Sequence, residues 1–98
     1  MNSFQFCSQI ISPVILKNSR DGRTKIEFTI SIETRNGTIR FPVVGHAELA
    51  DSLSHLVEGD WICATGRLES SVAGGLVVLL KDAFRLEPNT HSELVEHI

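Results

Sequence analysis

The sequence is poor in aromatic and sulfur-containing residues: it has no tyrosine, one tryptophan, one methionine and two cysteines among 98 residues. Cys7 and Cys63 stand alone, without a CxxC pair or a second metal-type cluster, so neither a zinc site nor a disulfide framework is indicated. We expect both to fill small apolar spaces. No stretch approaches the roughly 20 apolar residues of a membrane span, and residues 1–14 lack the basic segment of a signal peptide. The sequence therefore predicts a cytoplasmic protein without a metal, a cofactor or a membrane partner.

Positive charge is also scarce, because nine lysines and arginines face twelve carboxylates and give a net charge of −3. Lysine and arginine supply the affinity for phosphates, so this balance disfavours nucleic acid as a ligand. The charges are unevenly distributed, however. Residues 1–40 carry six cations and three carboxylates, whereas residues 41–98 carry three cations and nine carboxylates. This asymmetry predicts one basic face on an acidic protein.

Alternation of apolar and polar side chains is the strongest pattern that is present, and it predicts an all-β fold. The clearest case is residues 25–33, where every second side chain from Ile26 to Ile32 is apolar. The same pattern predicts further strands over residues 4–10, 38–44, 61–68 and 76–86.

Turn residues separate these strands. Asn36-Gly37 predicts a tight type I′ hairpin, because that turn requires positive φ at both central residues. The cluster SRDG at residues 19–22 predicts a mobile, basic loop. Pro42 lacks an amide donor, so this part of its strand should lie at a sheet edge or beside a bulge.

Residues 47–58 change period, with Leu49, Leu53 and Leu56 on one helical face and Gly59 placed to end the helix. The predicted order is three strands, a helix and two strands. This is the order of the OB-fold, a five-stranded Greek-key barrel with one short helix between strands three and four. We therefore predict one OB-fold domain over residues 1–88 and a short C-terminal tail over residues 89–98.

Two segments carry a resemblance to a known family. FPVVGHAELADSL and LVEGDWICATGRLESS are similar to the core segment of bacterial single-stranded DNA-binding proteins. Within this family, the VVGH stretch and the short chain most resemble the compact primosomal member that acts in replication restart. The likeness extends over residues 2–87 and is strongest over residues 41–68.

The resemblance implies that single-stranded DNA binds along strands two and three and along the loops that join strands one to two and four to five. Carried onto this chain, it implies a set of basic contacts in the first loop, on the sheet and near the second loop: Lys17, Arg20, Arg23, Lys25, Arg40 and Arg67. His46 lies near a position where single-strand binders often place an aromatic ring.

Few rings remain for stacking on bases, which normally accompanies a positive groove in single-strand binders. The alternation places four phenylalanines in the core: Phe4, Phe6, Phe28 and Phe84. Trp61 is predicted to point away from the core, where it can stack on a base, fill a contact between subunits or rest on the helix end.

Catalysis is not indicated. Asp51, Ser52 and His55 lie close in the predicted helix, but only Asp51 and His55 share a face, and no oxyanion donors accompany the serine. We therefore interpret the chain as a non-catalytic single-stranded DNA-binding protein that assists DNA replication or its restart. A homodimer is expected because so small a core gains from a partner subunit, and replication or primosome proteins are candidate partners.

The alternative belongs to another class of protein. The chain can be an OB-fold interaction module with little or no nucleic-acid binding, which docks a partner protein through strand edges or through the regions of Trp61 and Val72. The short ETRNGT hairpin, the loop after Glu69 without lysine or arginine, and the net negative charge favour this alternative.

Overall fold

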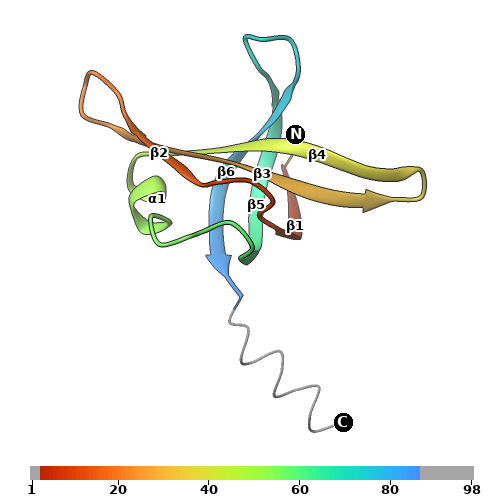
Figure 1. The fold of residues 1–98 in the computed structure, drawn as a ribbon. Helices are drawn as coiled ribbons and strands as arrows, with labels where there is room; N and C mark the ends of the chain where they lie inside the picture. Colours follow the sequence, from red (N-terminus) through yellow and green to blue (C-terminus); the bar gives the residue numbers. More distant parts are fainter. Residues whose placement is uncertain (1–2, 87–98) are drawn as a thin grey trace, which may run out of the picture.

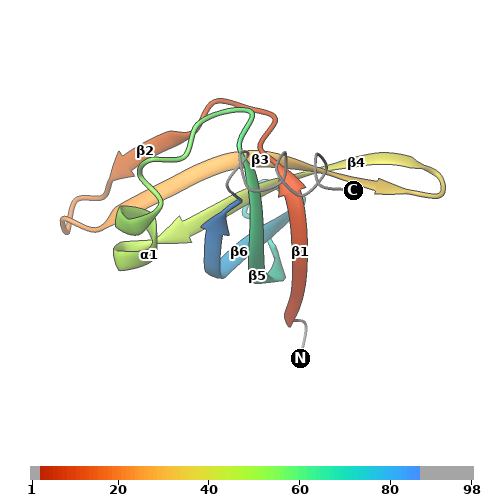
Figure 2. The same cartoon turned by 90° about the horizontal axis from the view of Figure 1, so that it is seen from below.

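A computed structural model describes residues 3–86 and shows an all-β molecule with one short helix (Figure 1). The strands in chain order are β1 (Ser3–Gln9), β2 (Ile15–Asn18), β3 (Thr24–Thr34), β4 (Gly37–His46), β5 (Trp61–Ser70) and β6 (Leu76–Arg85). The helix α1 (Ala47–Ser52) follows β4 directly. β3 and β4 cross β1, β5 and β6 at a steep angle, and α1 lies at one end of the molecule (Figure 2).

The six strands form one sheet in the order β1-β5-β6-β4-β3-β2. The all-β prediction with a single short helix is confirmed, but the prediction of a five-stranded barrel was wrong, because the sheet has six strands and is open. Within residues 3–86, the chain just after β1 meets β3 at one isolated bridge, Ile10↔Ile30, and through a 2.9 Å hydrogen bond from the N–H of Ile11 to the carbonyl oxygen of Thr29. The buried hydroxyl of Ser8 supports this contact by donating a hydrogen bond to the carbonyl oxygen of Ser31.

The strand that the sequence did not reveal is β2. No strand was predicted over these residues, but Ile15–Asn18 pairs with β3, and all four of its residues are exposed. Alternation marks a strand with one buried face, and β2 buries neither face. The expectation for Pro42 is confirmed, since β4 pairs with β6 only at Val43 and Val44 and is unpaired on that side at the proline.

The hairpin between β3 and β4 is confirmed, but its turn differs from the predicted one. Thr34 pairs with Gly37, so Arg35 and Asn36 are the two central residues. Neither has a positive φ, whereas Gly37 has a φ of 124°. The type I′ prediction was therefore wrong: the glycine follows the turn, and the Oγ1 atom of Thr34 accepts a hydrogen bond from the N–H of Asn36.

The helix is shorter than the apolar pattern predicts. It ends at Ser52, although Leu53 and Leu56 are still buried in the turns that follow it. Serine and aspartate are weak helix formers, and the hydroxyl of Ser52 hydrogen-bonds back to the carbonyl oxygen of Leu49. Gly59 therefore does not end the helix; it lies in the later turn with a φ of 97°.

The core lies between the two crossing layers and is built from the inward residues of β3, β4, β5 and β6, together with Ile10 and the residues after β4. Phe28 is buried as predicted, and Phe4 and Phe6 are partly buried against this cluster. Phe84 was predicted to be in the core, but it is 59% exposed. It lies directly across from Cys63 on the outer face of the sheet, because a register shift between Thr65 and Gly66 interrupts the pairing of β5 with β6.

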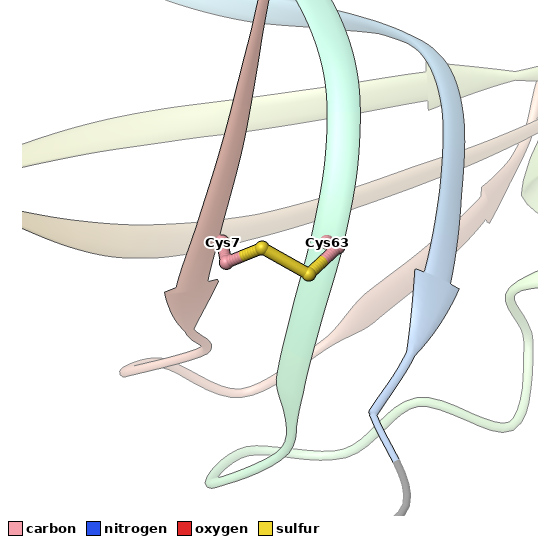
Figure 3. The surroundings of a disulfide bond; sticks show 2 residues. All are labelled: Cys7 and Cys63. Atoms are coloured by element: carbon pink, nitrogen blue, oxygen red, sulfur yellow. A yellow bond between two sulfur atoms is a disulfide. The ribbon is translucent and has the colours of Figure 1, made fainter.

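The prediction that the two cysteines are free apolar fillers was wrong. Cys7 on β1 and Cys63 on β5 are directly opposite residues of an antiparallel pair, with 4.1 Å between their Cα atoms, and they form a disulfide (Figure 3). Their separation of 56 residues in sequence hides this pairing, because only the strand register brings them together.

The predicted domain boundary at residue 88 and the tail over residues 89–98 lie outside the described residues. Among the residues described, no helix has the length and apolar character needed to cross a membrane.

Candidate nucleic-acid interface

A row of three side chains crosses the outward face of β2, β3 and β4. Lys17 lies opposite Lys25, and Lys25 lies opposite His46, in the registers of the two strand pairs. Alternation turns the neighbouring residues, Ile26 and Gly45, toward the core. The register therefore places two lysines and an imidazole side by side on the surface.

Glu27 sets the charge of this row. Its carboxylate lies 3.1 Å from the Nζ atom of Lys17 and 2.9 Å from the Nζ atom of Lys25. Hydrogen bonds from Lys25 and then from Lys17 lower the pKa of Glu27 below its ordinary value of 4.5. Glu27 is therefore ionised near neutral pH, and it offsets part of the positive charge of the two lysines.

The tip of the β2–β3 hairpin carries Arg20 and Arg23. The turn is closed by a 2.8 Å hydrogen bond from the N–H of Ser19 to the carbonyl oxygen of Arg23, and Gly22 adopts a φ of 84°. Asp21 accepts a hydrogen bond from the hydroxyl of Ser19, which lowers its pKa, and its Oδ2 atom lies 3.4 Å from the Nε atom of Arg23. Arg20 forms no ion pair with any residue in the described part of the chain.

Arg40 extends the basic surface along β4. It lies opposite Ser31 and shares the outward face with Lys25 and His46, as predicted. It lies six positions from His46 along the strand, a distance of about 20 Å. Arg40 also lacks an ion pair within residues 3–86. We define the basic face as the side chains of Lys17, Arg20, Arg23, Lys25, Arg40 and His46.

Two predicted site residues, Trp61 and Arg67, do not join the basic face. Both lie on β5, which pairs with β1 and β6, and two strands of the sheet order separate β5 from β3. Trp61 is 52% exposed, as predicted for an outward ring, and lies opposite Gln9. Arg67 forms a 2.7 Å ion pair with Glu69. The structure thus divides the predicted residues between two sheet regions.

The basic face offers almost no ring for a base to stack on. Phe28 and Phe41 belong to β3 and β4 but point to the core side, which leaves only the imidazole of His46 on the face. The most exposed large rings in residues 3–86, Trp61 and Phe84, lie on β5 and β6. The face is therefore equipped to neutralise phosphates rather than to stack bases.

Sequence reasoning missed Glu27 as a determinant of this face. Its contact with Lys25 could have been predicted, because residues two apart on a strand share a face and Lys25 precedes Glu27 by two. The contact with Lys17 has no such signal, since it depends on β2 pairing with β3.

Comparisons with solved structures agree with this architecture. The SSB domain of a Synechococcus protein superposes with a TM-score of 0.75 at 19% identity, over 85% of this chain and 93% of that chain. The single-stranded DNA binding protein from Thermus aquaticus gives 0.79 at 21% identity, over 89% of this chain and 41% of that one. The protein PriB from Ralstonia solanacearum superposes with a TM-score of 0.74 at 13% identity, over 89% of this chain and 99% of that chain.

These likenesses establish the fold. No protein-family profile matches the chain, and no curated relative matches it in sequence. The resemblance to single-stranded DNA-binding proteins, including the compact PriB, is confirmed as a likeness of fold.

Proposed function

We propose that this protein binds single-stranded DNA without catalysing a reaction, and that it assists DNA replication or replication restart. The observation that carries the proposal is the basic face on β2, β3, β4 and the β2–β3 turn, on a fold shared with proteins named for single-stranded DNA binding. Lysine and arginine reach phosphate oxygens without reading the bases, so binding has little sequence preference.

In this mechanism the phosphate backbone crosses the row of Lys17, Lys25 and His46 and continues toward Arg40. Arg20 and Arg23, at the tip of the β2–β3 turn, hold the strand from one side. The two lysines exchange part of their contact with Glu27 for contacts with phosphates. Because this exchange leaves Glu27 beside the ligand, and because rings are few, the affinity is in the micromolar range.

The direct test is fluorescence anisotropy of a labelled oligothymidine titrated with the full chain at several salt concentrations. Five cations in contact give a slope of log K against log salt of about −3.5, since each contact in a single strand contributes about −0.7. Absence of saturable binding at low salt and high micromolar protein would refute the proposal.

The homodimer that we also propose uses the free edge of β1. Among residues 3–86, and apart from the isolated bridge at Ile10, β1 pairs on one side only, with β5, and its sequence SFQFCSQ holds no charge and no proline. Edge strands that lack such protection pair readily with another strand. Sedimentation equilibrium should give a mass near twice that of the chain at micromolar concentration; a monomer under these conditions would exclude this assembly.

A protein-docking module is the second candidate, and the β5–β6 loop favours it. Val72 is fully exposed and Leu76 is 52% exposed, and the loop between them holds no charged residue. Apolar side chains at a hairpin tip suit a protein partner better than phosphates. The test is a pull-down from nuclease-treated lysate with the native chain and with Val72→Ser. One stoichiometric protein partner that the native chain recovers and the variant does not, together with no binding of oligothymidine, would support this candidate.

A further inference from the structure

The Cys7–Cys63 disulfide lies on the outer face of the sheet rather than in the core. Neighbouring residues on β1 and β5, Ser8 and Ile62, are buried, so alternation turns both cysteines outward. Cys7 is exposed and Cys63 is half-buried. Figure 3 shows the bond spanning the two strands.

A hollow of about 410 Å³ opens on the same face, and both cysteines line it. The other residues that line it include Gln5, Thr65, Asp82 and Phe84. Phe84 lies opposite Cys63, in line with the disulfide across the strands. Gln5 and Thr65 lie opposite each other, two residues along β1 and β5 from the two cysteines. An attacking group can therefore approach the sulfur atoms from solvent without separating the strands.

We propose that Cys7–Cys63 is a thiol–disulfide exchange site that reacts in the folded protein with small-molecule thiols, and that the Sγ atom of Cys7 is the sulfur attacked. Cys7 is the more exposed of the two residues, so an outside thiolate reaches its sulfur first, because exchange rates depend on access as well as on thiolate character. The hollow has the size of a small molecule, and Gln5, Thr65 and Asp82 provide polar groups for an amide or amino group of the thiol.

The reaction balances in two steps. A thiolate attacks Cys7 Sγ, the bond between the two cysteine sulfurs breaks, and Cys63 leaves as a thiolate that takes a proton from water. A second thiol then attacks the sulfur of the bound thiol and releases Cys7, which is protonated in turn. Two small thiols are oxidised to one small disulfide, and the protein gains two electrons and two protons.

Reduction changes how firmly β1 is held. In the oxidised protein the disulfide ties β1 to β5, and within residues 3–86 β1 has no second neighbouring strand beyond the bridge at Ile10. In the reduced protein the ladder with β5, the partly buried Phe4 and Phe6 and the hydrogen bond from Ser8 to Ser31 still hold it. We expect faster amide exchange in β1 after reduction, with little change in β3 and β4.

The test follows reduction of the native full chain by glutathione, using the mass increase of two hydrogen atoms and the emission of Trp61. Trp61 lies on the same face, two residues from Cys63, so we expect its emission to change when the disulfide is reduced. The proposal predicts a rate that rises with thiol concentration and does not change with urea below the unfolding transition. A rate that rises with urea in step with global unfolding would mean that the bond reacts only after unfolding, and it would overturn the proposal.

Two single variants identify the sulfur that reacts. Cys63→Ser leaves Cys7 as a thiol, and Cys7→Ser leaves Cys63. With oxidised glutathione, we expect Cys63→Ser to form the mixed disulfide about tenfold faster, because access controls the rate. Equal rates, or a faster Cys7→Ser, would exclude Cys7 as the entry point. Matching circular dichroism spectra of the two variants verify that both fold.

Discussion

At the scale of single residues, Glu27 controls how much positive charge the basic face presents. Its carboxylate contacts both Lys17 and Lys25, so it holds their ammonium groups in place and also lowers the charge that a phosphate meets. The exposed lysines limit what these ion pairs contribute to stability, because water and salt screen them.

Glu27→Gln should strengthen binding to oligothymidine by about two- to fivefold, because it removes a carboxylate that repels phosphate and competes for two lysines. Glu69→Gln is the matched control, since Glu69 forms its ion pair with Arg67 on β5, which is not a neighbour of β3 in the sheet. Anisotropy at one fixed salt concentration measures both variants. Equal effects of the two substitutions would show that only net charge matters.

The lowered pKa of Glu27 also gives a pH dependence with a defined sign. A carboxyl whose folded pKa is depressed stabilises the fold above its ordinary pKa, here 4.5, and loses that contribution as pH falls through the folded value. The native protein should therefore exceed Glu27→Gln in unfolding free energy by about 0.5 kcal/mol or less near neutral pH. Urea unfolding between pH 7 and pH 3 should show this difference disappear on acidification; a difference that grows would contradict the ion-pair account.

Gly66 is a position where only glycine fits. A Cβ atom there would lie 2.9 Å from the carbonyl oxygen of Leu79 and 3.0 Å from a methyl group of Val78. Gly66→Ala should lower the unfolding free energy by about 1–3 kcal/mol, because β5 and β6 must shift to admit the methyl group. Gly75→Ala is the control, since its Cβ would meet no atom within 4 Å. Urea unfolding of both variants measures the difference.

At the scale of elements, the sequence predicts strands well where one face is buried and poorly elsewhere. The alternation from Ile26 to Ile32 predicts nearly the whole of β3 because those side chains form the core. β2 escaped prediction because it is exposed on both faces, and α1 ends early because Ser52 and the residues after it favour turns.

The disulfide between β1 and β5 contributes to the stability of the whole molecule. Closing a loop with a sequence separation of 56 restricts the unfolded chain, which corresponds to about 4 kcal/mol in the chain-entropy description. We expect the unfolding free energy of the reduced protein to be lower by about this amount, so that it unfolds at a lower urea concentration. Unfolding curves that coincide for the two redox states would show that the bond does not constrain the unfolded chain.

At the scale of the whole molecule, the candidate site is a consequence of sheet order. The sequence assigned Trp61 and Arg67 to the same site as Lys17 and Lys25, but β5 and β3 are not neighbours in the sheet. Period-2 alternation identifies which face of a strand is outward, and it carries no information on which strands are adjacent. The shared outward face of Lys25 and Arg40 was predictable, because one hairpin turn sets the register of β3 with β4.

The central claim is that the basic face of β2, β3 and β4 binds the phosphates of single-stranded DNA. Two double variants that remove the same formal charge test it most directly: Arg20→Ala with Arg23→Ala on the β2–β3 turn, and Arg67→Ala with Lys81→Ala on β5 and β6. The measurement is oligothymidine anisotropy as a function of salt. We predict that the first pair weakens binding and makes the salt slope shallower by about 1.4, whereas the second changes the slope by less than about 0.5. Equal losses in the two variants, or a larger loss in the second, would contradict the assignment of the site to this face.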